Sequence, residues 1–251
     1  MRKWGIGFTA VLFVLIIWTG VSTQFASYIF PGPIDVFHEG IKQWEKGEIQ
    51  NHILLSLKRL VTGFLISAIL AFLIGILAGV SRWFKDFLTP LVTYFQATPP
   101  MAWAPLLIIV LGLGDAPMIA VIIIASFFPI LINVMQGMDM IPSSHIQAAK
   151  TLGAKGWKLG IFVYLPEIIP AAISGIYVGF AISWRSLVAA EMIGGNAGIG
   201  YFIAFNGQIG NTTSVLLGII LIGFLALLMD YVFLKPLYNR FAKWASRTAN
   251  G

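Results

Sequence analysis

Six long apolar runs constrain the fold of this 251-residue chain more than any other feature. A helix needs about 20 predominantly apolar residues to cross the hydrocarbon core of a bilayer. Hydrophobic residues make up 58% of the sequence and charged residues only 10%, whereas about a quarter of the residues in soluble domains are charged. We therefore predict an all-α membrane protein, a single domain over residues 1–251, with six transmembrane helices at about residues 4–22, 55–80, 87–113, 117–137, 167–190 and 213–234.

Lysine and arginine are distributed unevenly between the segments that connect these runs. Cytoplasmic loops of membrane proteins carry the excess of both residues. With the N-terminus inside, the outer segments hold only Lys42 and Lys46, and eleven basic residues are cytoplasmic: Arg2, Lys3, Arg82, Lys85, Lys150, Lys155, Lys158, Lys235, Arg240, Lys243 and Arg247. We expect both termini in the cytoplasm, and we attribute the net charge of +6 to this orientation and to contact with lipid headgroups rather than to nucleic-acid binding.

A polar loop of residues 138–166 separates the fourth run from the fifth. Pro142 suits the first turn of a short helix, and Gly153 suits a left-handed position at its end. A second short helix would follow, and Leu165 before Pro166 predicts a break, because the residue before a proline is pushed out of the α region. Two short helices would form a small projection that fits a groove on another protein, with an ordinary solvated loop as the alternative.

Proline and glycine predict the shape and packing of several runs. The third run contains Thr98-Pro99-Pro100, so we expect a broken helix whose freed carbonyl groups face protein or water, as in the lining of a pathway. Gly75 and Gly79 in the second run, and Gly175 and Gly179 in the fifth, have the spacing that lets helices approach closely. We interpret both glycine pairs as packing within the bundle, with a dimer contact as the alternative.

The outer segment between the first two runs predicts a surface helix. After the turn at Pro31-Gly32-Pro33, apolar residues recur at helical spacing, with charged residues on the opposite face; the apolar set is Ile34, Phe37, Ile41 and Trp44. This pattern is typical of a helix that lies in the membrane interface. Contact with a soluble partner is the alternative.

Residues for catalysis or metal binding are sparse. The chain has no cysteine, and His38, His52 and His145 do not have the spacing of a metal site. The phosphate-binding motif Gly-x-x-x-x-Gly-Lys-Ser/Thr is missing from the sequence. We expect no catalytic residue, no metal and no cofactor in this chain, so that any ATP would be bound by another subunit.

Charged residues inside the runs are the remaining functional candidates, because a charge is costly in lipid. Arg59 lies in the second run, and Trp184-Arg185 lies in the fifth, with Glu191 six residues further on. Either arginine would suit contact with an anionic solute in a central pathway. The alternatives are snorkelling to the interface and an ion pair between Arg185 and Glu191. The candidate pathway residues are Arg59, Thr98, Pro99, Pro100, Trp184, Arg185 and Glu191.

The order of residues in the 138–166 loop resembles a known family. Gln147-Ala148-Ala149, with Gly153 four residues later and Leu165-Pro166 at the end, is similar to the cytoplasmic "EAA" loop on which permeases of binding-protein-dependent ABC importers dock their ATPase. Gln147 replaces the usual glutamate, and an amide cannot make a charge-assisted bond to an arginine of the ATPase. Further similarity to permeases of the nitrate, sulfonate, taurine and bicarbonate group lies in Pro31-Gly32-Pro33, Ser56-Leu57 with Arg59, Thr98-Pro99-Pro100, Val188-Ala189-Ala190-Glu191-Met192 and Gly198-Ile199-Gly200-Tyr201.

This resemblance implies a bundle of the type I importer class in a prokaryotic inner membrane. It implies a second permease copy, two cytoplasmic ATPase subunits that bind ATP and Mg, an extracytoplasmic solute-binding protein and a small anionic solute. Related permeases carry thiamine-precursor pyrimidines, riboflavin or aromatic acids, so the solute stays open. An ion-coupled secondary transporter, which would need deep acidic residues, and a membrane-embedded enzyme, which would need a buried nucleophile, are the competing classes.

Overall fold

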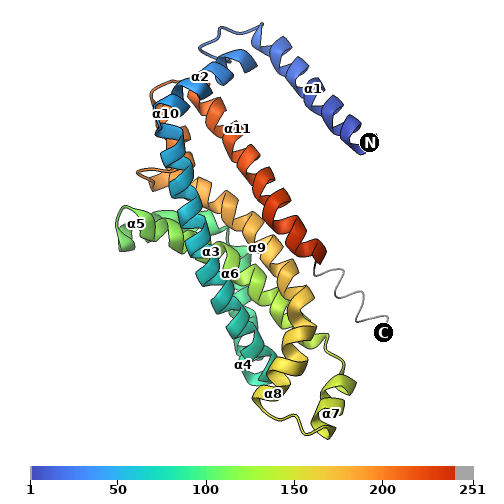
Figure 1. The fold of residues 1–251 in the computed structure, drawn as a ribbon. Coiled ribbons are helices and arrows are strands. Elements are labelled where there is room, and N and C mark those ends of the chain that lie inside the picture. Colours follow the sequence, from blue (N-terminus) through green and yellow to red (C-terminus); the bar gives the residue numbers. More distant parts are fainter. Residues whose placement is uncertain (1, 241–251) are drawn as a thin grey trace.

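The computed structural model describes residues 2–240, with side chains from residue 9 onward, and the regular elements among them are all helical. Figure 1 shows a long bundle with a surface helix at one end and a small helical projection at the other. The α-helices are α1 (Arg2–Ser22), α2 (Pro33–Glu45), α3 (Glu48–Val80), α4 (Arg82–Ala97), α5 (Ala104–Leu111), α6 (Asp115–Asp139), α7 (Ser143–Thr151), α8 (Trp157–Leu159), α9 (Leu165–Gly194), α10 (Ile199–Gln208) and α11 (Thr212–Met229). A 3-10 turn, η1 (Pro100–Trp103), and two π-helical turns, η2 (Gly160–Tyr164) and η3 (Asp230–Leu234), complete the chain.

The length and apolar character of these helices confirm the membrane fold but not the count of six spans. Four helical stretches are long and apolar enough to cross a bilayer: Glu48–Val80, Asp115–Asp139, Trp157–Gly194 and Thr212–Arg240. A fifth span results if α4 is joined to the η1–α5 pair across a bend of 89°. The apolar part of α1 with described side chains, Thr9–Ser22, is shorter than a full span.

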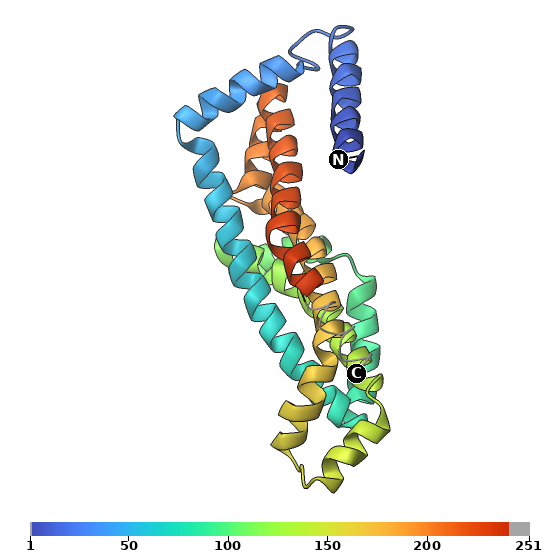
Figure 2. The same ribbon diagram turned by 45° about the vertical axis from the view of Figure 1, so that its right-hand side comes forward.

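Helix α6 forms the centre of the bundle, between α3 and α9 (Figures 1 and 2). Glycines allow both neighbours to approach it closely. A Cβ atom on Gly75 of α3 would lie 2.6 Å from Cγ1 of Val134, and one on Gly179 of α9 would lie 3.1 Å from the carbonyl oxygen of Ser126. The predicted packing role of the glycine pairs within the bundle is confirmed.

The third run is broken where the sequence predicted a break. Helix α4 ends at Ala97, Thr98 and Pro99 have extended backbone angles, and η1 leads directly into α5. Pro90 lies inside α4 without ending it. The two prolines in succession, rather than a single one, therefore mark the break.

One basic residue of each predicted set marks one end of the bundle. Helix α2, which contains Lys42, lies across one end, and α7, which contains Lys150, lies at the other (Figure 1). The apolar side chains predicted for the face of α2 are exposed, while Val36 packs against Ile49 and Leu217. The prediction of a surface helix is thus confirmed in its helical structure and exposed apolar face. Two members of the basic set, Lys243 and Arg247, lie outside the described residues.

Candidate functional site

The 138–166 loop forms a helical projection at the end of the bundle (Figures 1 and 2). Helix α7 begins after Pro142, as predicted. It ends at Thr151, and Gly153, two residues further on, has φ +87° and donates its N–H to the carbonyl of Lys150 at 3.0 Å. The N–H of Ala154 donates to the carbonyl of Ala149 at 2.9 Å. These bonds satisfy the last carbonyls of the helix, and they confirm the left-handed position predicted for the glycine.

The surface of this projection is partly apolar. Gln147 and Ala148 are exposed, whereas Ala149 is half-buried and packs against the buried cluster that contains Leu159, Val163 and Ile168. Beside them, Leu152 is 89% exposed and Trp157 is 68% exposed. Exposed large apolar side chains in a polar loop are typical of a contact surface for another molecule.

The predicted break at Leu165 and Pro166 is wrong. Leu165 has φ −58° and ψ −51°, and the helical stretch runs without interruption from Trp157 to Gly194. The π-helical turn η2 immediately precedes the proline. A π turn bonds residues five apart and is wider than an α turn, and Pro166 lies in the first turn of α9, where a missing N–H is tolerated.

A polar contact links the projection to the bundle. Nδ1 of His145 in α7 lies 2.7 Å from Oε1 of Glu167 in the first turn of α9. Together with the packing of Ala149, this contact ties α7 to the helix that runs on into the apolar span. A displacement of α7 would therefore act directly on α9.

Arg59 and Glu191 form a buried ion pair on the side of the bundle toward α2. Glu191 is fully buried and Arg59 is 2% exposed. Nη1 of Arg59 lies 2.9 Å from Oε1 of Glu191 and 2.6 Å from the carbonyl oxygen of Ala197. The same guanidinium binds Oδ1 of Asp115 through Nε at 2.7 Å. One arginine of α3 thus joins the start of α6, the end of α9 and the loop before α10.

The remaining acceptor capacity of Glu191 is satisfied by α3 and α10. The hydroxyl of Ser56 donates to the carboxylate at 2.9 Å, and the N–H of Gly200 donates at 3.0 Å. Gly198 has φ +110°, and a Cβ atom there would lie 2.2 Å from a carboxylate oxygen. Only glycine fits so close to the buried charge, which explains the glycine-rich turn before α10.

Arg185 is not part of this cluster, so the predicted ion pair between Arg185 and Glu191 is wrong. Its side chain is exposed, and no hydrogen bond or ion pair to it occurs within residues 9–240. The neighbouring Trp184 is 4% exposed and lies in a buried hydrophobic cluster with Met118 and Leu187, where its Nε1 has no partner among the described groups. The roles of Ser56 and Asp115 were missed, because partners more than fifty residues apart leave no local signal in the sequence.

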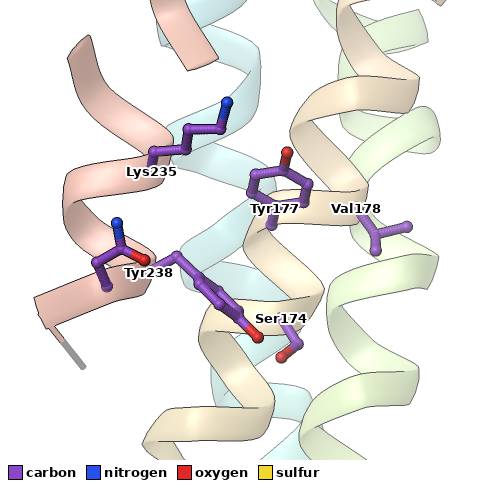
Figure 3. A pocket seen from close by; sticks show the side chains of 6 residues that line it. Ser174, Tyr177, Val178, Lys235 and Tyr238 are labelled. Atoms are coloured by element: carbon purple, nitrogen blue, oxygen red, sulfur yellow. The ribbon is translucent and has the colours of Figure 1, made fainter. Parts of the chain in front are cut away.

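A cavity of about 500 Å³ opens between α9 and the C-terminal helical stretch (Figure 3). Its lining is rich in hydroxyl and amide groups and consists of Ser174, Tyr177, Val178, Lys235, Tyr238 and Asn239. The hydroxyl of Tyr177 donates to Oδ1 of Asp230 at 3.0 Å, and Nζ of Lys235 lies 3.1 Å from Oδ2 of the same carboxylate. Lys235 is thereby neutralised. In the described part of the chain, no three metal-ligating side chains gather into a group.

A central helix between two glycine-faced spans, with a broken span beside it and a helical projection at one end, is the architecture of the membrane subunit of an ABC importer. The fold matches a chain of the MetNI methionine ABC transporter in an inward-facing conformation, with a TM-score of 0.60, 19% identity and coverage of 75% of this chain and 97% of that chain. At this identity the match shows the fold alone. The chain belongs to the family of binding-protein-dependent transport system inner membrane components, whose sequence model matches residues 71–235.

Individual relatives support this assignment over most of the chain. A putative ABC transporter permease of Methanocaldococcus jannaschii is 38% identical over 73% of this chain and 69% of the relative. The taurine transport permease TauC of Escherichia coli is 30% identical, with coverage of 95% and 88%. The bicarbonate transport permease CmpB of Synechococcus elongatus is 30% identical, with coverage of 94% and 86%. The expected resemblance is confirmed, and this chain is a multi-pass transport subunit rather than an enzyme.

Proposed function

We propose that this chain is the conduit of an ATP-driven importer and that its 138–166 loop receives the motion of the ATPase. The observation that carries the proposal is the geometry of this loop. Its apolar side chains Leu152 and Trp157 are exposed, and α7 is tied to α9 through His145 and Glu167. The family assignment implies both an ATPase and a solute-binding protein as partners.

The assembly we propose has a second copy of this chain and two ATPase subunits on the side of α7. ATP and Mg would be bound by the ATPase, because this chain has no phosphate-binding motif. The binding protein would deliver solute at the end of the bundle that carries α2, and both termini would lie in the cytoplasm. Inward-facing and outward-facing forms of the bundle would be selected by ATP and by the loaded binding protein.

For the solute we propose a small anion of the sulfonate, taurine, nitrate or bicarbonate type. The relatives named for taurine and bicarbonate align with nearly the whole chain, and the candidate pathway contains Arg185, which has no ion-pair partner within residues 9–240. A pyrimidine, riboflavin or an aromatic acid is the alternative cargo within the same class.

Disruption of the loop tests this proposal. Gly153→Val places a β-branched side chain at φ +87°, which costs on the order of 1–2 kcal/mol in the left-handed region. A new Cβ would touch nothing within 4 Å, so the distortion stays in the loop. We expect Gly153→Val to lose co-purification with the ATPase, whereas Gly153→Asn, whose side chain tolerates this conformation, should keep it.

Two further results refine the test. Gln147→Glu should hold or strengthen docking if the ATPase presents a basic residue, since a charge-assisted hydrogen bond is restored. Normal docking and normal solute uptake by Gly153→Val would show that this loop does not couple ATP to transport.

A further inference from the structure

Arg185 is an exposed cation inside an apolar span. It lies in the stretch Trp157–Gly194, which is long and apolar enough to cross a bilayer. Arg59 is also in a span, but two carboxylates and a carbonyl bind its guanidinium. Arg185 has no such partner within residues 9–240. A charge in this position is costly unless something in the working assembly compensates it.

The two carboxylates that bracket Arg185 along α9, Glu191 and Asp230, already have partners. Glu191 is six residues further along α9, which corresponds to about 9 Å of helix, and it is buried against Arg59. In the other direction, Asp230 lies at the level of Tyr177, eight residues back, and it binds Tyr177 and Lys235. The carboxylates of Glu191 and Asp230 are therefore both bound by other side chains.

A second copy of the chain would not supply the missing charge. Two copies related by a twofold axis along the membrane normal place each residue at the same depth. A partner copy would therefore repeat the same paired carboxylates, Glu191 and Asp230, at the same depths. This arrangement favours a counter-ion from outside the permease.

The surroundings of Arg185 leave room for a small ligand. Ala181 and Ala189, one helical turn to either side, are short and half-buried. Val178 and Met192, seven residues to either side, continue the same exposed stripe of α9. At Val178 this stripe meets the cavity that Val178 and Tyr177 line (Figure 3). Arg185 thus lies on the same exposed face of α9 as Val178, which lines this cavity.

We infer that Arg185, and not Arg59, contacts the solute in the conduit and that the ligand is an oxyanion such as a sulfonate or bicarbonate. The planar guanidinium presents N–H groups in a fork that matches two oxygen atoms of such a group. Arg59 instead holds the helices around Glu191 in place. This inference rests on the proposed function, because it assumes that α9 lines the transport pathway.

The test uses the complete transporter, with its ATPase and binding protein, in proteoliposomes that are offered labelled taurine, ethanesulfonate or bicarbonate. We expect Arg185→Gln to lower uptake of the accepted anion at least tenfold, while complex yield and binding-protein-stimulated ATP hydrolysis are retained. Arg185→Lys should keep part of the uptake, because it retains the charge but not the fork. The matched control is Lys58→Gln, which removes another exposed cation from a span and should leave uptake unchanged.

Three outcomes would overturn the inference. Wild-type uptake by Arg185→Gln would show that the guanidinium does not contact the solute, although the importer function would stand. Parallel loss of uptake, complex yield and ATP hydrolysis would assign Arg185 to lipid or subunit contacts instead. If the wild-type transporter accepts none of the three anions, a sulfonate or bicarbonate ligand is ruled out, and the inference fails with it.

Discussion

At the scale of single residues, one arginine joins three other segments of the bundle. The guanidinium of Arg59 contacts Asp115, Glu191 and the carbonyl of Ala197, and all of these contacts lie within 2.9 Å. A buried ion pair gives little net stability over apolar packing, but removal of one partner leaves the other charge unpaired. Replacement of Arg59 should therefore lower the stability of the protein.

Glu191→Leu should destabilise the protein less than Arg59→Met, because Asp115 still pairs with Arg59. Arg59→Met should cost about 3–5 kcal/mol, because it leaves Glu191 as an uncompensated buried charge. In detergent this corresponds to a fall in melting temperature on the order of 10 °C. The double variant should lose much less than the sum of the two single changes. Lys85→Met is the control, because its ion pair with Asp139 is partly exposed and contributes about 1 kcal/mol or less. Strict additivity in the double variant would contradict the paired geometry.

Sequence reasoning at this scale succeeded where the signal was local. The left-handed backbone of Gly153 followed from its position after a predicted helix, and the break at Thr98-Pro99-Pro100 followed from two successive prolines. It failed for the partner of Glu191, because nearness in sequence favoured Arg185 while the fold supplied Arg59 from 132 residues away. Local spacing does not encode such a contact.

At the scale of helices, small side chains determine how closely α3 and α9 approach α6. A Cβ atom added to Gly75 would lie 2.6 Å from a side-chain atom of α6, and one added to Gly179 would lie 3.1 Å from a backbone atom of α6. Dispersion contacts of this kind are a main source of helix association in lipid, where the hydrophobic effect does not drive the helices together. The spacing of these glycines was evident from the sequence, but the identity of the shared partner helix was not.

Gly75→Ala and Gly223→Ala make a matched pair of variants that tests this packing. The added methyl group at Gly75 would overlap Val134 and force α3 from α6, which should cost about 1–3 kcal/mol. The same change at Gly223 of α11 meets nothing within 4 Å. It should leave the free energy of unfolding unchanged or raise it by up to about 1 kcal/mol, because alanine has a higher helix propensity than glycine. Thermal unfolding of both variants in detergent gives the comparison. Equal stability of the two would rule out close packing at Gly75.

The largest error at the scale of elements concerns Pro166. The expectation of a break used the preference of the preceding residue, but the π-helical turn η2 allows the helix to pass through the proline. A wide turn of this type has no clear sequence signature. Its consequence for the fold is a continuous helix from Trp157 to Gly194 that connects the loop to the span.

At the scale of the whole molecule, the distribution of basic residues predicts the orientation. Lys155 lies beside the loop projection and Lys42 lies on α2, at opposite ends of the bundle (Figure 1). Because the chain has no cysteine, Lys155→Cys and Lys42→Cys give single labelling sites without background. An impermeant thiol reagent applied to intact cells should label the second variant and not the first. Labelling of both from outside would contradict the proposed topology.

The membrane class of the whole chain was predictable from its apolar runs, whereas the number of crossings was not. The third run bends by 89° between α4 and α5, and apolar length alone does not distinguish a crossing from a segment that turns back. The 138–166 loop was recognisable because polar residues interrupt apolar ones, although its exposed Leu152 and Trp157 became visible only in the folded chain.

The central claim is that this chain moves a solute with energy supplied by a partner that hydrolyses ATP. The direct measurement is uptake of labelled taurine or bicarbonate into proteoliposomes that contain this chain, alone or with its ATPase and binding protein, with ATP or with a proton or sodium gradient. We predict that the chain alone hydrolyses no ATP and that uptake requires the partners together with ATP. Hydrolysis of ATP by the isolated chain, or uptake driven by an ion gradient without partners, would contradict this account.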